Sequence, residues 1–196
     1  MKRFFDFICS LILLMVLSPV LLVLAIWVGL DSPGGVFYKQ ERVGKGGKVF
    51  RLLKFRSMRP GSDKKGLLTV GFADNRITGA GRFLRKTKLD ELPQLINVLK
   101  GDMSLVGPRP EVPRYVAMYN EVQQRVLDVR PGITDHASIR YFEENELLAQ
   151  SSDPERTYIE EIMPKKLAIN LEYVNHHNLM TDLGILFRTF LRMVRG

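Results

Sequence analysis

The longest apolar stretch of the chain runs from residue 7 to residue 30, and only small residues, Cys9 and the Ser18-Pro19 pair interrupt it. This length suffices for a membrane-spanning helix, which needs about 20 residues. Pro19 removes a backbone donor and favours a kink, while the Ser18 hydroxyl can bond a freed carbonyl. The pattern predicts a helix that breaks at this pair, and it leaves open whether the helix spans the membrane or enters and turns back.

Basic residues flank the apolar stretch on both sides. They are Lys2 and Arg3 before it and Lys39, Arg42, Lys45 and Lys48 after it. Because basic flanks favour the cytoplasmic side of a membrane, both ends are expected to stay inside, as they do in a re-entrant helix. A cleaved signal peptide is the less favoured alternative, since the run is long and lacks an Ala-x-Ala-like cleavage site.

Turn residues between two apolar-rich segments predict a β-hairpin over residues 36–58. The turn is Gly44-Lys45-Gly46-Gly47, in which glycines can supply positive φ angles. The second segment ends with Lys54 and Arg56 on alternate residues, so both side chains are expected on one face of the strand. Residues 60–75 then read as a loop by their Gly, Asp and Lys content.

Helical periodicity or helix-forming residues dominate the rest of the chain. The segments are 90–100, 111–127, 143–149, 154–174 and 181–195. The fold class expected is therefore α+β, mostly helical, with one small antiparallel hairpin. The last segment is amphipathic and basic, and two interpretations stay open for it: an interfacial helix on a membrane surface, or a terminal helix packed on the core.

Charge and cysteine content narrow the choice of partners. The 196 residues include 29 Lys and Arg against 21 Asp and Glu, a net charge of +8. This balance favours nucleic acid, anionic lipid head groups or phosphorylated substrates. Cys9 is the single cysteine, so the sequence excludes a disulfide framework and a thiolate metal site. It also contains no P-loop and no dinucleotide-binding glycine motif.

Two adjacent carboxylates, Asp90 and Glu91, lie between a cluster of basic residues and a Gly-Pro-Arg-Pro turn that presents Arg109. The helical spacing that follows predicts that Asp90 is the N-cap of a helix ending near Lys100-Gly101. At that position the helix dipole and unpaired N–H groups would favour the ionised carboxylate, which can attack phosphorus. The alternative is that Asp90 only caps the helix.

Three motifs carry a resemblance to a known family. They are KFRSM at residues 54–58, RKTKLDELPQLINVLKGDMSLVGPRP at residues 85–110 and VRPGIT at residues 129–134. Together they resemble the bacterial sugar transferase family, the small monotopic phosphoglycosyl transferases, and the likeness covers nearly the whole chain. The resemblance implies an enzyme that moves a sugar 1-phosphate from a UDP-sugar to a membrane polyprenyl (undecaprenyl) phosphate. UMP is released, and the product initiates glycoconjugate assembly.

The resemblance also implies residue roles. Asp90 matches the nucleophile, which forms an aspartyl-phosphosugar intermediate in a ping-pong reaction, and a ligand of the Mg²⁺ cofactor. Glu91 matches the partner acid that positions or deprotonates the polyprenyl phosphate. Arg85 matches a phosphate-binding arginine, and Arg109 matches the arginine at the nucleotide end. Further substrate-binding residues in the matching motifs are Lys54, Arg56 and Arg130.

Ser18 and Pro19 match the break of the family's re-entrant membrane helix. The implied organisation is a re-entrant anchor at residues 1–32 and a catalytic domain at residues 33–196. The domain would sit on the cytosolic face of the bacterial inner membrane, in contact with membrane lipids. Whether the chain forms a homo-oligomer is left open.

One segment departs from the family's pattern. Many relatives follow the Pro-Gly-Ile-Thr turn with glycine and a Gln-Val stretch, whereas Asp135 and His136 follow Thr134 here. We hypothesise that Asp135 and His136 face the sugar and favour an amino-bearing or N-acetyl-bearing substrate. The alternative is a loop variant without sugar contact.

Two other classes of function compete with the enzyme. A membrane-anchored scaffold would keep the fold without the reaction, but it would have no use for the acid pair. A nucleic-acid binder would suit the positive charge, but the sequence shows no recognition helix. We therefore expect an enzyme whose partners do not include nucleic acid.

Overall fold

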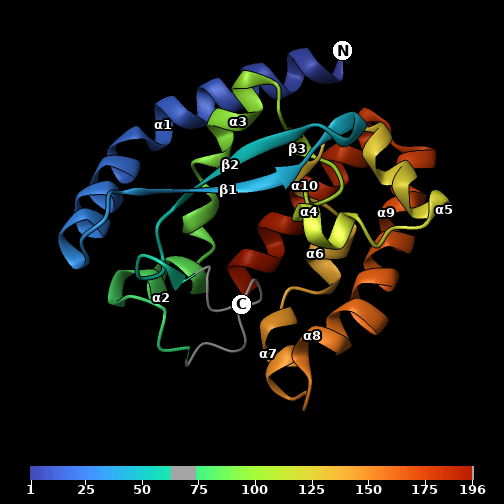
Figure 1. Ribbon diagram of the computed structural model, residues 1–196. Helices are drawn as coiled ribbons and strands as arrows, with labels where there is room; N and C mark the ends of the chain where they lie inside the picture. The colour runs from blue at the N-terminus through green and yellow to red at the C-terminus, as the bar shows by residue number, and fades with distance from the viewer. Residues whose placement is uncertain (63–73, 196) are drawn as a thin grey trace.

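The computed structural model describes residues 1–62 and 74–195, and Figure 1 shows how its elements are arranged. Helices make up most of the fold, and two small two-stranded sheets accompany them. Most of the loop predicted at residues 60–75 lies outside the described residues. The elements in chain order are α1 (Lys2–Asp31), β1 (Phe37–Val43), η1 (Lys45–Gly47), β2 (Val49–Phe55), α2 (Gly79–Lys86), η3 (Leu89–Glu91), α3 (Gln94–Lys100), β3 (Ser104–Val106), α4 (Pro113–Val116), α5 (Glu121–Gln124), η4 (Arg125–Asp128), β4 (Gly132–Thr134), α6 (His136–Arg140), α7 (Glu144–Ala149), α8 (Pro154–Thr157), η5 (Tyr158–Ile162), α9 (Met163–His176) and α10 (Leu179–Arg195).

The apolar N-terminal stretch forms one continuous helix, α1, which corrects the predicted break at Ser18-Pro19. Pro19 cannot donate to the carbonyl of Met15, and the Ser18 hydroxyl donates to that carbonyl instead, at 2.8 Å. This replacement hydrogen bond satisfies the carbonyl, so the helix continues past the proline. Among the described helices, α1 alone is long and apolar enough to cross a membrane, with a mean hydropathy of 2.9.

Residues on one side of α1 hold the helix to the rest of the protein near both of its ends. Near its start, the buried Asp6 accepts hydrogen bonds from the Ser104 hydroxyl (2.8 Å) and from the backbone N–H of Leu105 (3.3 Å). Near its end, Leu24 and Val28 are buried in a cluster with residues of α2. The other side is apolar and exposed, and it includes Phe4, Phe7, Leu11, Met15, Val16, Leu22, Val23, Ile26 and Leu30.

The predicted antiparallel hairpin is confirmed as β1 and β2. Phe37 pairs with Phe55 at one end and Val43 with Val49 at the other. At the turn Gly46 has a φ of 65°, the left-handed conformation expected of glycine there. In Figure 1 the hairpin lies between α1 and the C-terminal helices. It therefore links the N-terminal helix to the C-terminal half of the fold.

A second, parallel pair of strands was not predicted. In this pair, Ser104 of β3 lies opposite Gly132 of β4, and Val106 lies opposite Thr134. A Cβ atom on Gly132 would lie 2.1 Å from the backbone nitrogen of Gly107, so no larger residue fits. This close approach brings the turn after β3 next to the start of α6.

The helical predictions for the C-terminal half hold in part. The segment 111–127 is not one helix, because Asn120 accepts the N–H of Gln123 (2.9 Å) and starts a new helix, α5. The segment 154–174 is confirmed as α8, the π-helical turn η5 and α9. In α10, Ile185 is buried in the core while Phe187 and Phe190 are exposed. Packing on the core is thus confirmed, and contact with a membrane stays a prediction.

Candidate active site

The adjacent carboxylates, called the carboxylate pair below (Asp90 and Glu91), lie in the short 3₁₀ turn η3. Before this turn Lys88 has a φ of 59°, the one positive φ among the described non-glycine residues. The α-helix itself starts only at Gln94. The prediction that Asp90 is the N-cap is therefore wrong, whereas the helix end at Gly101 is confirmed by its left-handed φ of 93°.

Asp90 is buried, with 6% of its surface exposed, and its carboxylate accepts no hydrogen bond from residues 1–62 and 74–195. Burial raises the pKa of this carboxyl; the charge of Lys54 opposes that rise, and the charge of Glu91 adds to it. The expectation that a helix N-terminus favours the ionised form is wrong, because no helix N–H reaches the carboxylate. Both oxygens are left without a partner in the described part of the chain.

Glu91 has the opposite surroundings. Arg109 donates to both of its oxygens, with Nη1 at 3.1 Å from Oε2 and Nη2 on Oε1. Lys54 donates to Oε1 from 3.0 Å. Burial acts to raise the pKa of the Glu91 carboxyl, but the charges and hydrogen bonds of Arg109 and Lys54 outweigh it. They hold the pKa of this carboxyl well below its usual range, so Glu91 is ionised and fully engaged.

The position of Arg109 depends on Asp135. The fully buried carboxylate of Asp135 accepts the backbone N–H of Arg109 (2.9 Å) and that of Ser138. It is the N-cap of α6, and it ties that helix to the Pro-Arg-Pro turn. The hypothesis that Asp135 faces the sugar is therefore wrong, because its side chain has no exposed surface.

Two further cations, Arg85 and Lys88, lie near the carboxylate pair. Both side chains are partly buried, and burial lowers the pKa of each. The charges of Asp90 and Glu91 act on both cations in the opposite direction. With Lys54 and Arg109, four cations thus act on two carboxylates, and the net positive charge suits a diphosphate.

Three other predicted residues form no ion pair or hydrogen bond with the carboxylate pair. Arg56 is buried, and its guanidinium donates to the carbonyl of Ser32 at the end of α1. Arg130 donates to the carbonyl of Gly101 at 2.9 Å, at the end of α3. Both arginines therefore bond helix ends. His136 lies half-buried in the first turn of α6.

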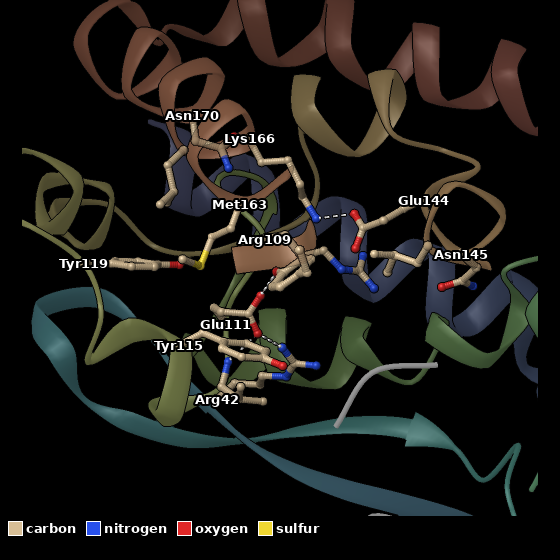
Figure 2. A pocket seen from close by; sticks show the side chains of 14 residues that line it. Arg42, Arg109, Glu111, Tyr115, Tyr119, Glu144, Asn145, Met163, Lys166 and Asn170 are labelled. Atoms are coloured by element: carbon tan, nitrogen blue, oxygen red, sulfur yellow. Dashed lines mark hydrogen bonds and ion pairs between the residues drawn. The ribbon is translucent and has the colours of Figure 1, made fainter. Parts of the chain in front are cut away.

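A cavity of about 160 Å³ also borders Arg109, and we call it the Arg109 cavity (Figure 2). Its wall contains two ion pairs, Arg42 with Glu111 at 2.8 Å and Lys166 with Glu144 at 2.6 Å. The sequence alone did not predict this site. Its lining residues lie on β1, the segment around α4, α7 and α9. Because these elements are far apart in the sequence, no local motif predicts the cavity.

The whole chain, residues 1–196, matches the model of the family described as bacterial sugar transferase. The chain belongs to this family. The resemblance inferred from the three motifs is thereby confirmed. Two of those motifs supply the carboxylate pair, Arg85, Arg109 and Lys54. The fold brings these groups together from β2, α2, η3 and the turn after β3.

Several relatives of different length are similar in sequence to this chain. The chain is 36% identical over 199 residues to the UDP-N-acetylgalactosamine-undecaprenyl-phosphate N-acetylgalactosaminephosphotransferase of Aeromonas hydrophila. This alignment covers 100% of this chain and 44% of the relative. It is 37% identical over 195 residues to the UDP-glucose:undecaprenyl-phosphate glucose-1-phosphate transferase of Escherichia coli K12, covering 98% and 40%. It is 38% identical over 205 residues to the exopolysaccharide production protein PSS of Rhizobium leguminosarum bv. phaseoli, covering 100% and 96%. The chain spans less than half the length of the first two relatives.

Proposed function

We propose that this chain transfers a sugar 1-phosphate from a UDP-sugar to a polyprenyl phosphate, giving a polyprenyl-diphospho-sugar and UMP. The names of the relatives describe undecaprenyl-phosphate sugar phosphotransferases. The observation that carries the proposal is the difference within the carboxylate pair. Glu91 is held by two cations, whereas Asp90 has no partner among the described residues and lies among four cations. A carboxylate so placed can attack a phosphorus atom whose negative charge those cations offset.

In the first step, a carboxylate oxygen of Asp90 forms a bond to the β-phosphorus of the UDP-sugar. The bond from that phosphorus to the oxygen bridging the two phosphates breaks, and the oxygen leaves with UMP. Asp90 then carries the sugar phosphate as an acyl phosphate. Arg85 and Arg109 would bind phosphate oxygens through their planar guanidinium groups.

In the second step, a phosphate oxygen of the polyprenyl phosphate attacks the same phosphorus, and the Asp90 carboxylate leaves. Asp90 returns to its starting state, so the kinetics are ping-pong. We assign Glu91 a positioning role for Arg109 and Lys54. A carboxyl whose pKa is held well below its usual range is a poor general base, so deprotonation by Glu91 is disfavoured.

The residues present fit a Mg²⁺ ion that is held mainly by the substrate. Mg²⁺ is usually bound by one or two carboxylates together with phosphate oxygens and water. Asp90 has oxygens without a protein partner, and residues 1–62 and 74–195 hold no cluster of three or more His, Cys, Asp or Glu. When bound, Mg²⁺ would neutralise charge on the diphosphate.

We propose that α1 is a monotopic anchor on the cytosolic face of the bacterial inner membrane, with its exposed apolar side in the lipid and both of its ends on the cytosolic side. Its length is about 45 Å at 1.5 Å per residue, yet both ends are attached to the same body. Lys2 bonds the carbonyl of Val106 (3.1 Å) and pairs with Asp182, and at the other end Arg56 bonds the carbonyl of Ser32. A domain on one side of the membrane then keeps both ends of α1 on that side.

Exposed apolar side chains on α1 and α10 support this placement. Large exposed apolar surfaces mark membrane or protein contacts. On α10 the exposed apolar residues are Leu179, Met180, Leu183, Phe187, Phe190, Met193 and Val194. An amphipathic helix of this kind would lie in the lipid head-group region, where a soluble nucleotide sugar and a lipid phosphate can meet.

The proposal is tested by incubating the full chain with Mg²⁺ and UDP-glucose or UDP-N-acetylgalactosamine, first without lipid. We expect UMP release and an increase in intact protein mass equal to one sugar phosphate. Undecaprenyl phosphate should then remove the added mass and yield the lipid-linked sugar. UMP release that requires lipid and leaves no adduct would contradict the covalent intermediate but keep the transfer. No UMP release under either condition would contradict the proposed function.

A further inference from the structure

The Arg109 cavity is adjacent to the proposed reaction centre, because Arg109 both lines it and bonds Glu91. Pockets that enclose a whole drug-sized ligand measure about 300–1,000 Å³. At about 160 Å³ this cavity has room for one ring and not for a complete nucleotide sugar. A ligand that reaches the carboxylate pair with its diphosphate could therefore place a single ring here.

The charges in the wall favour a neutral ring. Glu111 is paired with Arg42 and accepts the Tyr158 hydroxyl, and Glu144 is paired with Lys166. Figure 2 shows the side chains of Glu144 and Lys166 directed toward one another at the wall. Since each cation has its own carboxylate, a phosphate would gain no unpaired positive charge and would approach two carboxylates. Both carboxylates keep lone pairs that can accept hydrogen bonds from hydroxyl groups.

The aromatic residues of the wall offer little open ring face. Tyr115, Tyr119 and Tyr158 are only 2%, 8% and 3% exposed, and the rings of Tyr115 and Tyr158 pack against each other with centroids 5.2 Å apart. A nucleobase is usually held by stacking on an exposed aromatic face. A saturated ring with several hydroxyl groups needs instead the carboxylate, amide and ammonium groups that this wall presents.

Two asparagines supply hydrogen-bonding groups that no other described residue uses. Asn170 projects from α9 toward the cavity (Figure 2), is 5% exposed, and its Oδ1 has no partner within the described ranges. Buried polar atoms are nearly always hydrogen-bonded, so an unpaired carboxamide at a cavity indicates a missing partner. Asn145 of α7 lies half-buried at the same cavity.

We propose that the Arg109 cavity binds the sugar ring of the nucleotide sugar, and that Asn170 and Asn145 help to select that sugar. The inference rests on the proposed function. It replaces Asp135, which is fully buried, with residues of α7 and α9 as the determinants of sugar specificity.

The test compares Asn170→Ala and Asn145→Ala with the unsubstituted chain. With undecaprenyl phosphate present as acceptor, steady-state UMP release is measured with UDP-glucose, UDP-galactose, UDP-N-acetylglucosamine and UDP-N-acetylgalactosamine, and the inhibition constant of UMP is measured alongside. Loss of one hydrogen bond to the sugar should raise KM roughly tenfold for the preferred nucleotide sugar and change the ranking of the four. The inhibition constant of UMP should not change, because UMP has no sugar in the cavity. Asn175→Ala, at an exposed position of the same helix, is the matched control and should match the unsubstituted chain.

The outcomes separate the inference from the proposed function. An unsubstituted chain that releases no UMP from any of the four compounds would overturn both. An active chain whose two variants keep its KM values and ranking would overturn the cavity assignment alone. A weaker affinity for UMP would place the nucleoside in the cavity and would also overturn it. Asn145→Ala alters a half-buried side chain, so it reports even if Asn170→Ala fails to fold.

Discussion

The carboxylate pair and the Arg109 cavity share one arginine but hold their charges in different ways. Around the pair, four cations act on two carboxylates, and one carboxylate is left without a partner among the described residues. In the cavity, each of the other two cations is matched with its own carboxylate. An excess of positive charge suits a diphosphate, whereas balanced charge suits a neutral ring. The comparison indicates that the carboxylate pair and its cations could bind the diphosphate of a nucleotide sugar while the adjacent cavity binds the sugar ring.

The largest effect is expected from removing the unpartnered carboxylate. Asp90→Asn should lower the rate of UMP release at least about 10³-fold, because the amide cannot form the acyl phosphate. Its melting temperature should change little, since Asp90 makes no hydrogen bond with the described residues. UMP release and the mass adduct are the measurements, and Asp128→Asn, an exposed site on η4, is the control. Activity within tenfold of the unsubstituted chain would exclude Asp90 as the nucleophile.

A smaller loss is expected from the partnered carboxylate. Glu91→Gln removes the charge that holds Arg109 and Lys54, so UMP release should fall about 10²-fold. The free energy of unfolding should also fall by about 2 kcal/mol, the usual contribution of hydrogen bonds to charged groups. Glu160→Gln removes the exposed pair with Arg156 and should change neither quantity. If Glu91→Gln and Glu160→Gln change UMP release and the free energy of unfolding by equal amounts, the bonds of Glu91 with Arg109 and Lys54 have no special role.

Asp135 connects the two sites through the backbone of Arg109. In Asp135→Asn one of the two N–H groups bonded by the carboxylate loses its acceptor, and the Arg109 turn is held less firmly. We expect kcat/KM to fall about tenfold and the free energy of unfolding to fall by about 1–3 kcal/mol. Asp153→Asn disturbs a comparable but exposed N-cap on α8 (3.1 Å to the Arg156 nitrogen). That control should leave kcat/KM unchanged, and an equal loss there would argue against a positioning role for Asp135.

The smallest effect is a shift of the pH profile. Asp90 must be ionised to attack, and burial raises the pKa of its carboxyl, so activity should be lost on acidification at a higher pH than for an exposed aspartate. The charge of Lys54 lowers this pKa and the charge of Glu91 raises it. Lys54→Met should therefore move the acidic limb to higher pH and Glu91→Gln should move it to lower pH. The profiles are normalised to each variant's maximum, and shifts in the same direction would contradict the assignment of the limb to Asp90.

Local signals in the sequence predicted several elements correctly. The glycines at Gly46 and Gly101 adopt the left-handed φ angles expected of a hairpin turn and a helix end. The same signals failed at Asp90, where a 3₁₀ turn precedes the helix and Lys88 takes an uncommon backbone conformation. They also failed at Pro19, because the Ser18 hydroxyl bonds the carbonyl that the proline leaves free. Each failure reflects a competing local hydrogen-bond arrangement that residue preferences do not distinguish.

The sequence by itself determined the family, the carboxylate pair and most of the cations near it, because these lie in short contiguous motifs. Only the tertiary structure decided how they are used. Lys54 meets Glu91 from 37 residues away, and Arg42 meets Glu111 from 69 residues away. Arg56 and Arg130 bond helix ends, and Asp135 holds the backbone of Arg109. Motifs report which groups are present, whereas ion pairing, burial and cavities depend on which distant segments pack together.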